Sequence, residues 1–288
     1  MSTNYGIRTA TFLDRRLKAG STVAKYLDAN GVNTNEAQTV RILNIDIDSS
    51  SLGAYNETAT TQTLTLAEYG KQEWTLDYNY FVFLRIQDTQ VADVPVGSLV
   101  KDTAEAWIDE KFVPDFDEYA LAKIIAARPS GNITTWDGTT LTGVTGLLNK
   151  FYNTVTVVTN GGGTAANSIA FVPATFADKL RAFITTFDGS DKGYTAGVNG
   201  VIGKLKGVMV VETVDDYFAS YPTVKAVIFD KRAVAAPTQK MTPKNGGRKF
   251  IKDVPGFGGS ELQLRARGGV FVLDRKVYTI ATLPTSSS

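Results

Sequence analysis

The stretch from Ala92 to Arg128 constrains the fold most, because it is the longest segment of the chain that can be read as helix. Mostly apolar residues recur there at steps of three and four, which places them on one side of a helix. They are Val96, Leu99, Val100, Thr103, Trp107 and Ile108, and the opposite side carries Lys101, Asp102, Glu105, Asp109 and Glu110. Two helical pieces here would span about 50 Å, which is longer than a compact domain of this size needs.

Pro114 interrupts this helical pattern. Proline lacks a backbone N–H donor and crowds the preceding turn, so the first helix should end or kink near Phe112. Asp115 and Asp117 then stand where carboxylates favour the start of a second helix. Its apolar positions are Tyr119, Leu121, Ala122, Ile124 and Ile125.

Two alternating patterns precede the helical stretch and predict strands over Val40 to Asp48 and over Trp74 to Ile86. The segment between them, Ser49 to Gln72, is rich in Ser, Thr and Gly. A loop of this length is uncommon in a compact domain unless it binds something or extends away from the body. We therefore expect a long two-stranded projection, preceded by a polar arm over residues 1–40 with one helical piece between Phe12 and Leu27.

The composition changes to Pro, Ser, Gly, Asn and Thr between Arg128 and Gly146, which indicates a domain boundary. Beyond it the patterns predict a mixed α/β unit. Its strands are expected over Thr154–Thr159, Ser168–Val172, Gly207–Glu212 and Val224–Asp230, and its helix over Ala174–Phe187. A loop over Lys240–Gly259 then leads to short strands and a tail: Glu261–Arg267, Val270–Leu273, Val277–Ala281 and finally Thr282–Ser288.

Three of these segments carry a family resemblance. The run KFVPDFDEYALAKIIA resembles the part of tailed-bacteriophage major capsid proteins in which a long spine helix meets a proline and a D-x-Y-x-x-x-K motif, here Asp117 to Lys123. NSIAFVPATF resembles a strand leading into a helix of their axial domain, and ARGGVFVLDRKVYTI resembles their closing strands. The resemblance implies an α+β chain with the Hong Kong 97-like capsid fold. It divides the chain into an N-terminal arm (1–40), an extended β-hairpin loop (41–88), a peripheral domain with the spine helix (89–130 and 240–288) and an axial α/β domain (131–239).

The same resemblance implies a coat protein without enzymatic activity. Copies would assemble as hexamers and pentamers into the icosahedral head of a virion, built in the bacterial cytoplasm, enclosing double-stranded DNA without sequence-specific contacts. Portal, decoration and scaffolding proteins are possible partners. Because few residues precede Val40, either scaffolding, if used, is a separate chain or this chain is already the mature product. The alternatives are an encapsulin shell, which encloses enzymes, and a monomeric carbohydrate-binding or adhesive β-rich protein.

The composition removes several function classes. The chain contains no His and no Cys, which excludes disulfides, most catalytic triads and most zinc sites. A net charge of +1 argues against a protein that holds nucleic acid mainly by neutralising phosphates. No apolar run is long enough for a membrane span. Acidic and basic residues nevertheless form separate blocks along the chain, which suits either contacts between copies or an ordinary solvated surface.

The remaining candidate sites each have a simpler interpretation. Asp115, Asp117 and Glu118 could bind Ca²⁺ or Mg²⁺, but helix capping and surface contacts explain them. Asp46 and Asp48 could act as paired carboxylates, but they continue the polar face of a strand. Two Gly-rich segments, Gly197 to Leu205 and Gly161 to Gly163, lack the spacing of a phosphate loop or dinucleotide motif. We therefore expect no catalytic, cofactor-binding or metal-binding residues, and no cofactor.

Two further possibilities concern contacts rather than catalysis. The basic cluster of Lys240, Lys244, Arg248, Lys249 and Lys252 could touch DNA, but it holds only one aromatic residue, Phe250, and a solvated loop or a contact with acidic groups of another copy is favoured. Some members of the resembling family cross-link an extended-loop lysine to an asparagine of a neighbour. Lys71 and Asn245 are the candidates by position, but neither lies in a matching motif, so we expect no cross-link.

Overall fold

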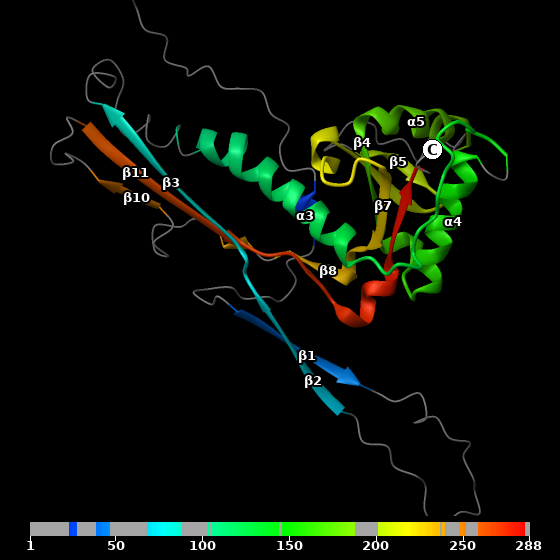
Figure 1. Ribbon diagram of the computed structural model, residues 1–288, viewed down its shortest axis with the longest axis horizontal. Helices are drawn as coiled ribbons and strands as arrows, with labels where there is room; N and C mark the ends of the chain where they lie inside the picture. Colours follow the sequence, from blue (N-terminus) through cyan, green and yellow to red (C-terminus); the bar gives the residue numbers. More distant parts are fainter. Residues whose placement is uncertain are drawn as a thin grey trace, which may run out of the picture.

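The structure is a computed structural model that describes residues 23–27, 39–46, 68–87, 103, 105–143, 146–187, 201–236, 238–239, 248–251 and 259–285. Its larger part is a five-stranded sheet covered by helices, and its smaller part is an elongated open sheet continued by a two-stranded hairpin (Figure 1). The mixture of helices with mostly antiparallel strands confirms the predicted α+β class.

The five-stranded sheet forms the core of the larger part. Its strand order is β13 (Ile280–Pro284), β7 (Val224–Asp230), β4 (Ser168–Pro173), β6 (Val208–Thr213) and β5 (Val201–Leu205). Only β4 and β6 run parallel. All six residues of β4 are buried, as expected for a central strand covered on both faces. Strands β4, β6 and β7 match their predicted positions, whereas β5 was not predicted.

Helices cover both faces of this sheet, and strand alternation decides which residues meet them. Ile169 and Phe171 pack into one cluster with α3 (Val113–Ala127). Ala170 and Val172 pack into a second cluster with α4 (Leu147–Asn160) and α5 (Ala174–Phe187). Successive residues of β4 therefore serve opposite helix layers, as the period of two in a strand requires. Helix α5 matches its predicted range.

Helix α4 replaces the predicted strand over Thr154–Thr159, so that prediction is wrong. The run TVTVVT has high strand propensity, but Leu147, Phe151, Val155 and Val158 form a buried helical stripe. Three threonine hydroxyls donate back to carbonyls one turn earlier: Thr154 to Lys150, Thr156 to Tyr152 and Thr159 to Val155, at 2.8–3.0 Å. Burial of the stripe therefore outweighs the local preference of the β-branched residues.

The spine helix runs through Pro114 without ending. Residues 105–107 are α-helical, η3 (Ile108–Phe112) is a π-helical turn, and α3 begins directly at Val113. The wider turn accommodates the proline, as π-bulges commonly do. Of the two predicted outcomes, an end or a distortion near Phe112, the structure has the distortion. Residues 92–102 lie outside the described residues.

The hairpin and the open sheet share one long segment of chain. β1 (Thr39–Asp46) pairs antiparallel with β2 (Glu68–Thr75), and β3 (Tyr78–Gln87) pairs antiparallel with β11 (Gly259–Gly268). β11 also pairs with β10 (Arg248–Ile251) and β9 (Thr238–Gln239). The strand predicted over Trp74–Ile86 is therefore two strands, which separate at Leu76 and Asp77 and join different sheets. β10 lies in the predicted loop Lys240–Gly259, which is a second correction.

The C-terminal segment enters the core. β12 (Phe271–Val272) pairs with β8 (Val234–Ala235), η8 (Asp274–Thr279) follows, and β13 ends at Pro284. The strand predicted over Val277–Ala281 begins three residues later, and the predicted tail is wrong for Thr282 and Leu283, which are fully buried. Backbone bonds from Thr134 to Thr282 and from Trp136 to Pro284 cover the outer edge of β13. Of the predicted arm helix, only η1 (Ala24–Tyr26) and its neighbours lie within the described residues.

Candidate functional site

The open sheet carries exposed aromatic side chains. Phe81 is 68% exposed, Phe83 53% and Tyr80 52%, and all three lie on β3. The rings of Phe81 and Phe83 are 5.2 Å apart in an edge-to-face arrangement. Contiguous exposed aromatic side chains commonly mark an interaction surface. Tyr80 points to the opposite face of β3, so we call Phe81 and Phe83 the aromatic face.

A groove of about 480 Å³ lies between β3 and the start of the spine helix. It is lined by Tyr78, Tyr80, Phe81, Val82, Trp107, Lys111, Phe112 and Asp115. At its floor the hydroxyl of Tyr78 donates to Asp115 at 2.7 Å. Burial, and then the neighbouring carboxylate, raise the pKa of Tyr78 above its ordinary value. Tyr78 therefore stays protonated and acts as a hydrogen-bond donor that joins the sheet to the helix.

Asp117 anchors the N-terminal segment to the spine helix. Its carboxylate is fully buried and accepts hydrogen bonds from the backbone N–H groups of Val23 at 3.2 Å and Ala24 at 2.9 Å. Val23 and Leu27 are buried in the same cluster as α3. The predicted surface or capping role is therefore wrong for Asp117, which binds a segment more than 90 positions away.

Asp77 lies at the point where β2 and β3 separate. It accepts hydrogen bonds from the hydroxyl of Tyr119 and from the ammonium group of Lys123, the latter at 2.7 Å. Partial burial alone would raise the pKa of Asp77, but these two donors lower it below its ordinary value. On the other side of the junction Trp74 stacks on Phe271 with ring centres 5.4 Å apart. These contacts fix the direction in which the hairpin leaves the open sheet.

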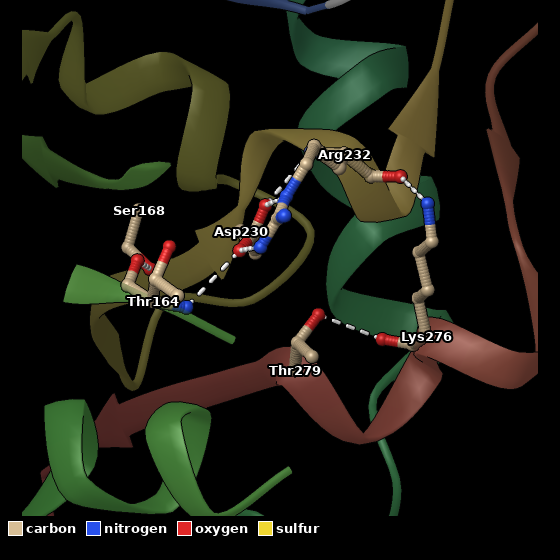
Figure 2. Close-up of polar contacts among 6 residues, drawn as sticks. All are labelled: Thr164, Ser168, Asp230, Arg232, Lys276 and Thr279. Atoms are coloured by element: carbon tan, nitrogen blue, oxygen red, sulfur yellow. Dashed lines mark hydrogen bonds and ion pairs between the residues drawn. The ribbon is translucent and has the colours of Figure 1, made fainter. Parts of the chain in front are cut away.

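Figure 2 shows a third polar cluster, at the end of β7 in the larger part. The buried carboxylate of Asp230 accepts from the backbone N–H groups of Thr164 at 3.1 Å and Arg232 at 3.0 Å. The guanidinium group of Arg232 also donates to both carboxylate oxygens, at 2.9 and 2.7 Å. Lys276 donates to the carbonyl of Arg232 at 3.0 Å. Through these bonds the cluster joins three chain segments: the loop before β4, the end of β7 and η8.

The other residues weighed in the sequence are dispersed. Asp115 is exposed beside Tyr78, and Glu118 is half-buried one residue from Asp117. Asp46, Lys71, Arg248 and Lys249 lie in strands whose side chains fall outside the described residues, as do Asp48, Lys240, Lys244, Lys252 and Asn245 altogether. Within the described ranges, no three His, Cys, Asp or Glu side chains gather in a way that could hold a metal ion. None of the helices described there is long and apolar enough to cross a membrane.

The Gly-rich segments weighed as phosphate loops have ordinary structural roles where the structure describes them. Val201 to Leu205 is β5, and Lys206 and Gly207 form the turn to β6, both with positive φ. At Gly161 an added Cβ would lie 2.1 Å from the carbonyl oxygen of Tyr278. Gly161 therefore permits the end of α4 to approach η8 closely.

The aromatic face and the Asp230 cluster were missed in the sequence. Phe81 and Phe83 alternate with Tyr80 and Val82, so the strand is apolar on both faces, and that was the available signal. Asp230 and Arg232 are separated by one residue at the end of a predicted strand, a spacing too common to single out.

Comparison with known proteins gives a clear result for structure only. No family model and no curated protein matches the sequence. A chain from Mycobacterium phage Bobi is similar with a TM-score of 0.67 and 14% identity, covering 100% of this chain and 97% of that one. A chain from the capsid structure of the cyanophage P-SCSP1u has a TM-score of 0.64 and 14% identity, with the same coverage of both. The asymmetric unit of the bacteriophage PhiM1 mature capsid gives 0.58 and 12%, covering 100% and 92%. Over essentially its whole length, this chain has the fold of phage capsid chains.

Proposed function

We propose that this protein is the major capsid protein of a tailed bacteriophage, with the Hong Kong 97-like fold. Its role is mechanical: many copies tile an icosahedral head around double-stranded DNA. The likeness to the cyanophage capsid structure over the whole of this chain carries the proposal. A resemblance restricted to one domain could reflect a shared building block, whereas this one covers 100% of the chain.

Three features of the molecule support assembly from copies of the chain. The β1–β2 hairpin projects from the body (Figure 1), beyond the reach of the chain's own large core. The aromatic face is exposed on a sheet that, among the described residues, has no helix packed over Phe81 and Phe83. Asp117 holds the N-terminal segment at a fixed position on the spine helix. Such surfaces gain burial when several copies associate.

We further propose the division into an arm (1–40), an extended loop (41–88), a peripheral domain (89–130 and 240–288) and an axial domain (131–239). The arm, the extended loop and the spine helix supply contacts between hexamers and pentamers. Portal, decoration and separate scaffolding proteins would complete the virion, which would assemble in the bacterial cytoplasm.

Purification of the expressed protein tests the proposal. We expect closed shells of uniform size by electron microscopy and a matching sedimentation coefficient, either from this chain alone or with the phage's scaffolding protein. A protein that stays monomeric under all these conditions contradicts it. Shells that enclose a protein cargo bearing a conserved docking peptide, in place of DNA, would instead identify an encapsulin.

A further inference from the structure

The two ends of the five-stranded sheet carry opposite charge. β4 and β6 run parallel while β7 runs antiparallel to them, so the segment after β6 and the segment after β7 lie at opposite ends. The first segment is η5 (Asp215–Phe218) and the second is η6 (Lys231–Ala233), which contacts η8. Figure 1 shows η5 in yellow near the top of this part and η8 in red at the bottom. Seven residues of β7 place the two ends about 20 Å apart.

The end at η6 and η8 is basic. Among the described residues it carries five basic side chains and two acidic ones, a net charge of +3. The basic side chains are Lys206, Lys231, Arg232, Arg275 and Lys276, and the acidic ones are Asp230 and Asp274. We call these residues the basic end.

Three lysines of the basic end contact neutral groups, so these contacts do not cancel their positive charge. Lys206 donates to the carbonyl of Tyr152 at 3.1 Å and to the hydroxyl of Thr156 at 2.8 Å. Lys276 donates to a carbonyl, and the ammonium group of Lys231 lies 5.7 Å from the centre of the Tyr26 ring. These are neutral groups, so they orient the cations and leave their field directed outward.

The opposite end, at η5 and the start of α5, is acidic. Its described residues include six acidic side chains and three basic ones, a net charge of −3. The acidic side chains are Glu118, Asp137, Asp178, Glu212, Asp215 and Asp216, and the basic ones are Lys179, Arg181 and Lys225. We call these residues the acidic end.

Neutral donors hold Asp137 and Asp215 of the acidic end, whereas Asp178 and Glu212 pair with Arg181, which is counted among its basic side chains. Asp137 accepts from the backbone N–H groups of Thr139 and Thr140, both at 2.9 Å, and these bonds lower its pKa to about 2. Asp215 accepts from the backbone N–H of Thr175 at 3.1 Å. Burial, and then the charges of Asp117, Asp216 and Glu118, raise the pKa of Tyr217 to about 12. Asp137 is therefore ionised at neutral pH, and Tyr217 beside the acidic end stays protonated.

We infer that the five-stranded domain associates head to tail with a second copy of this chain, the basic end of one copy facing the acidic end of the next. A contact between two different surfaces of the same molecule is heterologous, and repeated by rotation it closes into a ring. Opposite charges at the two ends favour this orientation and oppose the two like-end alternatives. The inference rests on the proposed function, because the ring would be a hexamer or pentamer of the shell, and it assigns the residues that orient neighbours within the ring.

Two charge-reversed variants test the inference. The basic-end variant combines Lys231→Glu and Lys276→Glu, and the acidic-end variant combines Asp178→Lys and Asp216→Lys. The first has two acidic ends and the second has two basic ends. Each alone should self-associate at least about tenfold more weakly than wild type in low salt, where the Debye length is about 30 Å. An equimolar mixture should recover association, because unlike ends can again alternate.

A control with the same change in charge is Lys111→Glu with Lys150→Glu, residues of the spine helix and of α4 that belong to neither end, and it should associate as wild type does. Sedimentation velocity measures association, and circular dichroism verifies that each variant is folded. If the wild-type protein forms shells and both variants associate normally, the inference is wrong but the proposed function stands. Variants that stay apart after mixing also overturn it, as does a basic-end variant that assembles normally but binds double-stranded DNA more weakly. A wild-type protein that never assembles refutes the proposed function itself, and the inference with it.

Discussion

The backbone N–H of Ala24 donates a 2.9 Å hydrogen bond to the carboxylate of Asp117, although the two residues are 93 positions apart in the sequence. Asp117 is fully buried on the spine helix, and Val23 beside Ala24 is fully buried too. A charged acceptor thus satisfies two backbone donors at the point where the N-terminal segment meets the body. The path of the arm is thereby fixed by one side chain of the helix.

Replacement of Asp117 by Asn should therefore lower the free energy of unfolding by about 1–3 kcal/mol, because one carboxylate oxygen becomes an NH₂ donor that faces a backbone N–H. The N-terminal segment should also become more susceptible to proteolysis than the rest of the chain. Urea denaturation and limited proteolysis with mass spectrometry measure the two effects.

Asp109→Asn is the matched control for Asp117→Asn. Asp109 lies on the same helix but is exposed, so its replacement should change stability by less than about 0.5 kcal/mol. Equal stability of the two variants would show that the contact between Asp117 and the N-terminal segment contributes nothing.

Asp230 should make stability depend on pH. Burial would raise its pKa, but the hydrogen bonds from Arg232 and Thr164 lower it below its ordinary value. A carboxyl group whose folded-state pKa is lowered stabilises the protein above the unfolded-state pKa of about 3.9, and this stabilisation is lost as pH falls through the folded-state value. Asp230→Asn should cost about 1–3 kcal/mol at pH 7, and the difference from wild type should shrink below about pH 4.

Denaturation curves at several pH values measure this difference. Asp178→Asn serves as the control, because Asp178 pairs with Arg181 while its own side chain is 74% exposed. Such surface pairs contribute at most about 1 kcal/mol. A constant difference for Asp230→Asn from pH 7 to pH 3 would contradict the assigned titration.

Gly161→Ala tests the close approach of α4 to η8. The added Cβ would lie 2.1 Å from the carbonyl oxygen of Tyr278, so backbone must move on one side or the other. The backbone of Gly161, with φ −73°, suits alanine, so the cost is steric and should be about 1–3 kcal/mol. At Gly131 no atom lies within 4 Å of an added Cβ, and Gly131→Ala should leave the thermal midpoint unchanged or slightly higher. Unfolding curves that rank the two variants the other way would refute this packing.

How far the sequence predicts this structure depends on whether a residue's partner is local. The alternation in β4 and the helical spacing in α3 and α5 are local patterns, and their elements were predicted correctly. The strand predicted over Thr154–Thr159 is wrong because β-branched residues favour a strand locally, whereas burial of the stripe from Leu147 to Val158 favours a helix.

The predictions for Asp117 and for the strand over Trp74–Ile86 are wrong for the same reason: the partners that decide them lie far away in the sequence. The position of Asp117 near a helix start suggested capping, but its partners come from a segment more than 90 residues earlier. The strand from Trp74 to Ile86 looked continuous because alternation persists through Leu76 and Asp77, although the two halves pair with different strands. Pairing partners of a strand are a property of the whole chain, and no local pattern encodes them.

The aromatic face should affect assembly and not folding. Phe81 and Phe83 are more than half exposed in the single chain, so Phe81→Ser with Phe83→Ser should change the free energy of unfolding by less than about 1 kcal/mol. If neighbouring copies cover these rings, the same change removes apolar burial from every copy of the contact, and the protein concentration needed for assembly should rise by at least about tenfold. Leu141→Ser is the control, since Leu141 is 43% exposed on a loop away from β3.

Urea denaturation measures the effect on folding, and light scattering over a concentration series measures the effect on assembly. Assembly at the wild-type concentration would exclude the aromatic face from the contacts, and a large loss of stability would mean that these rings are covered within the single chain.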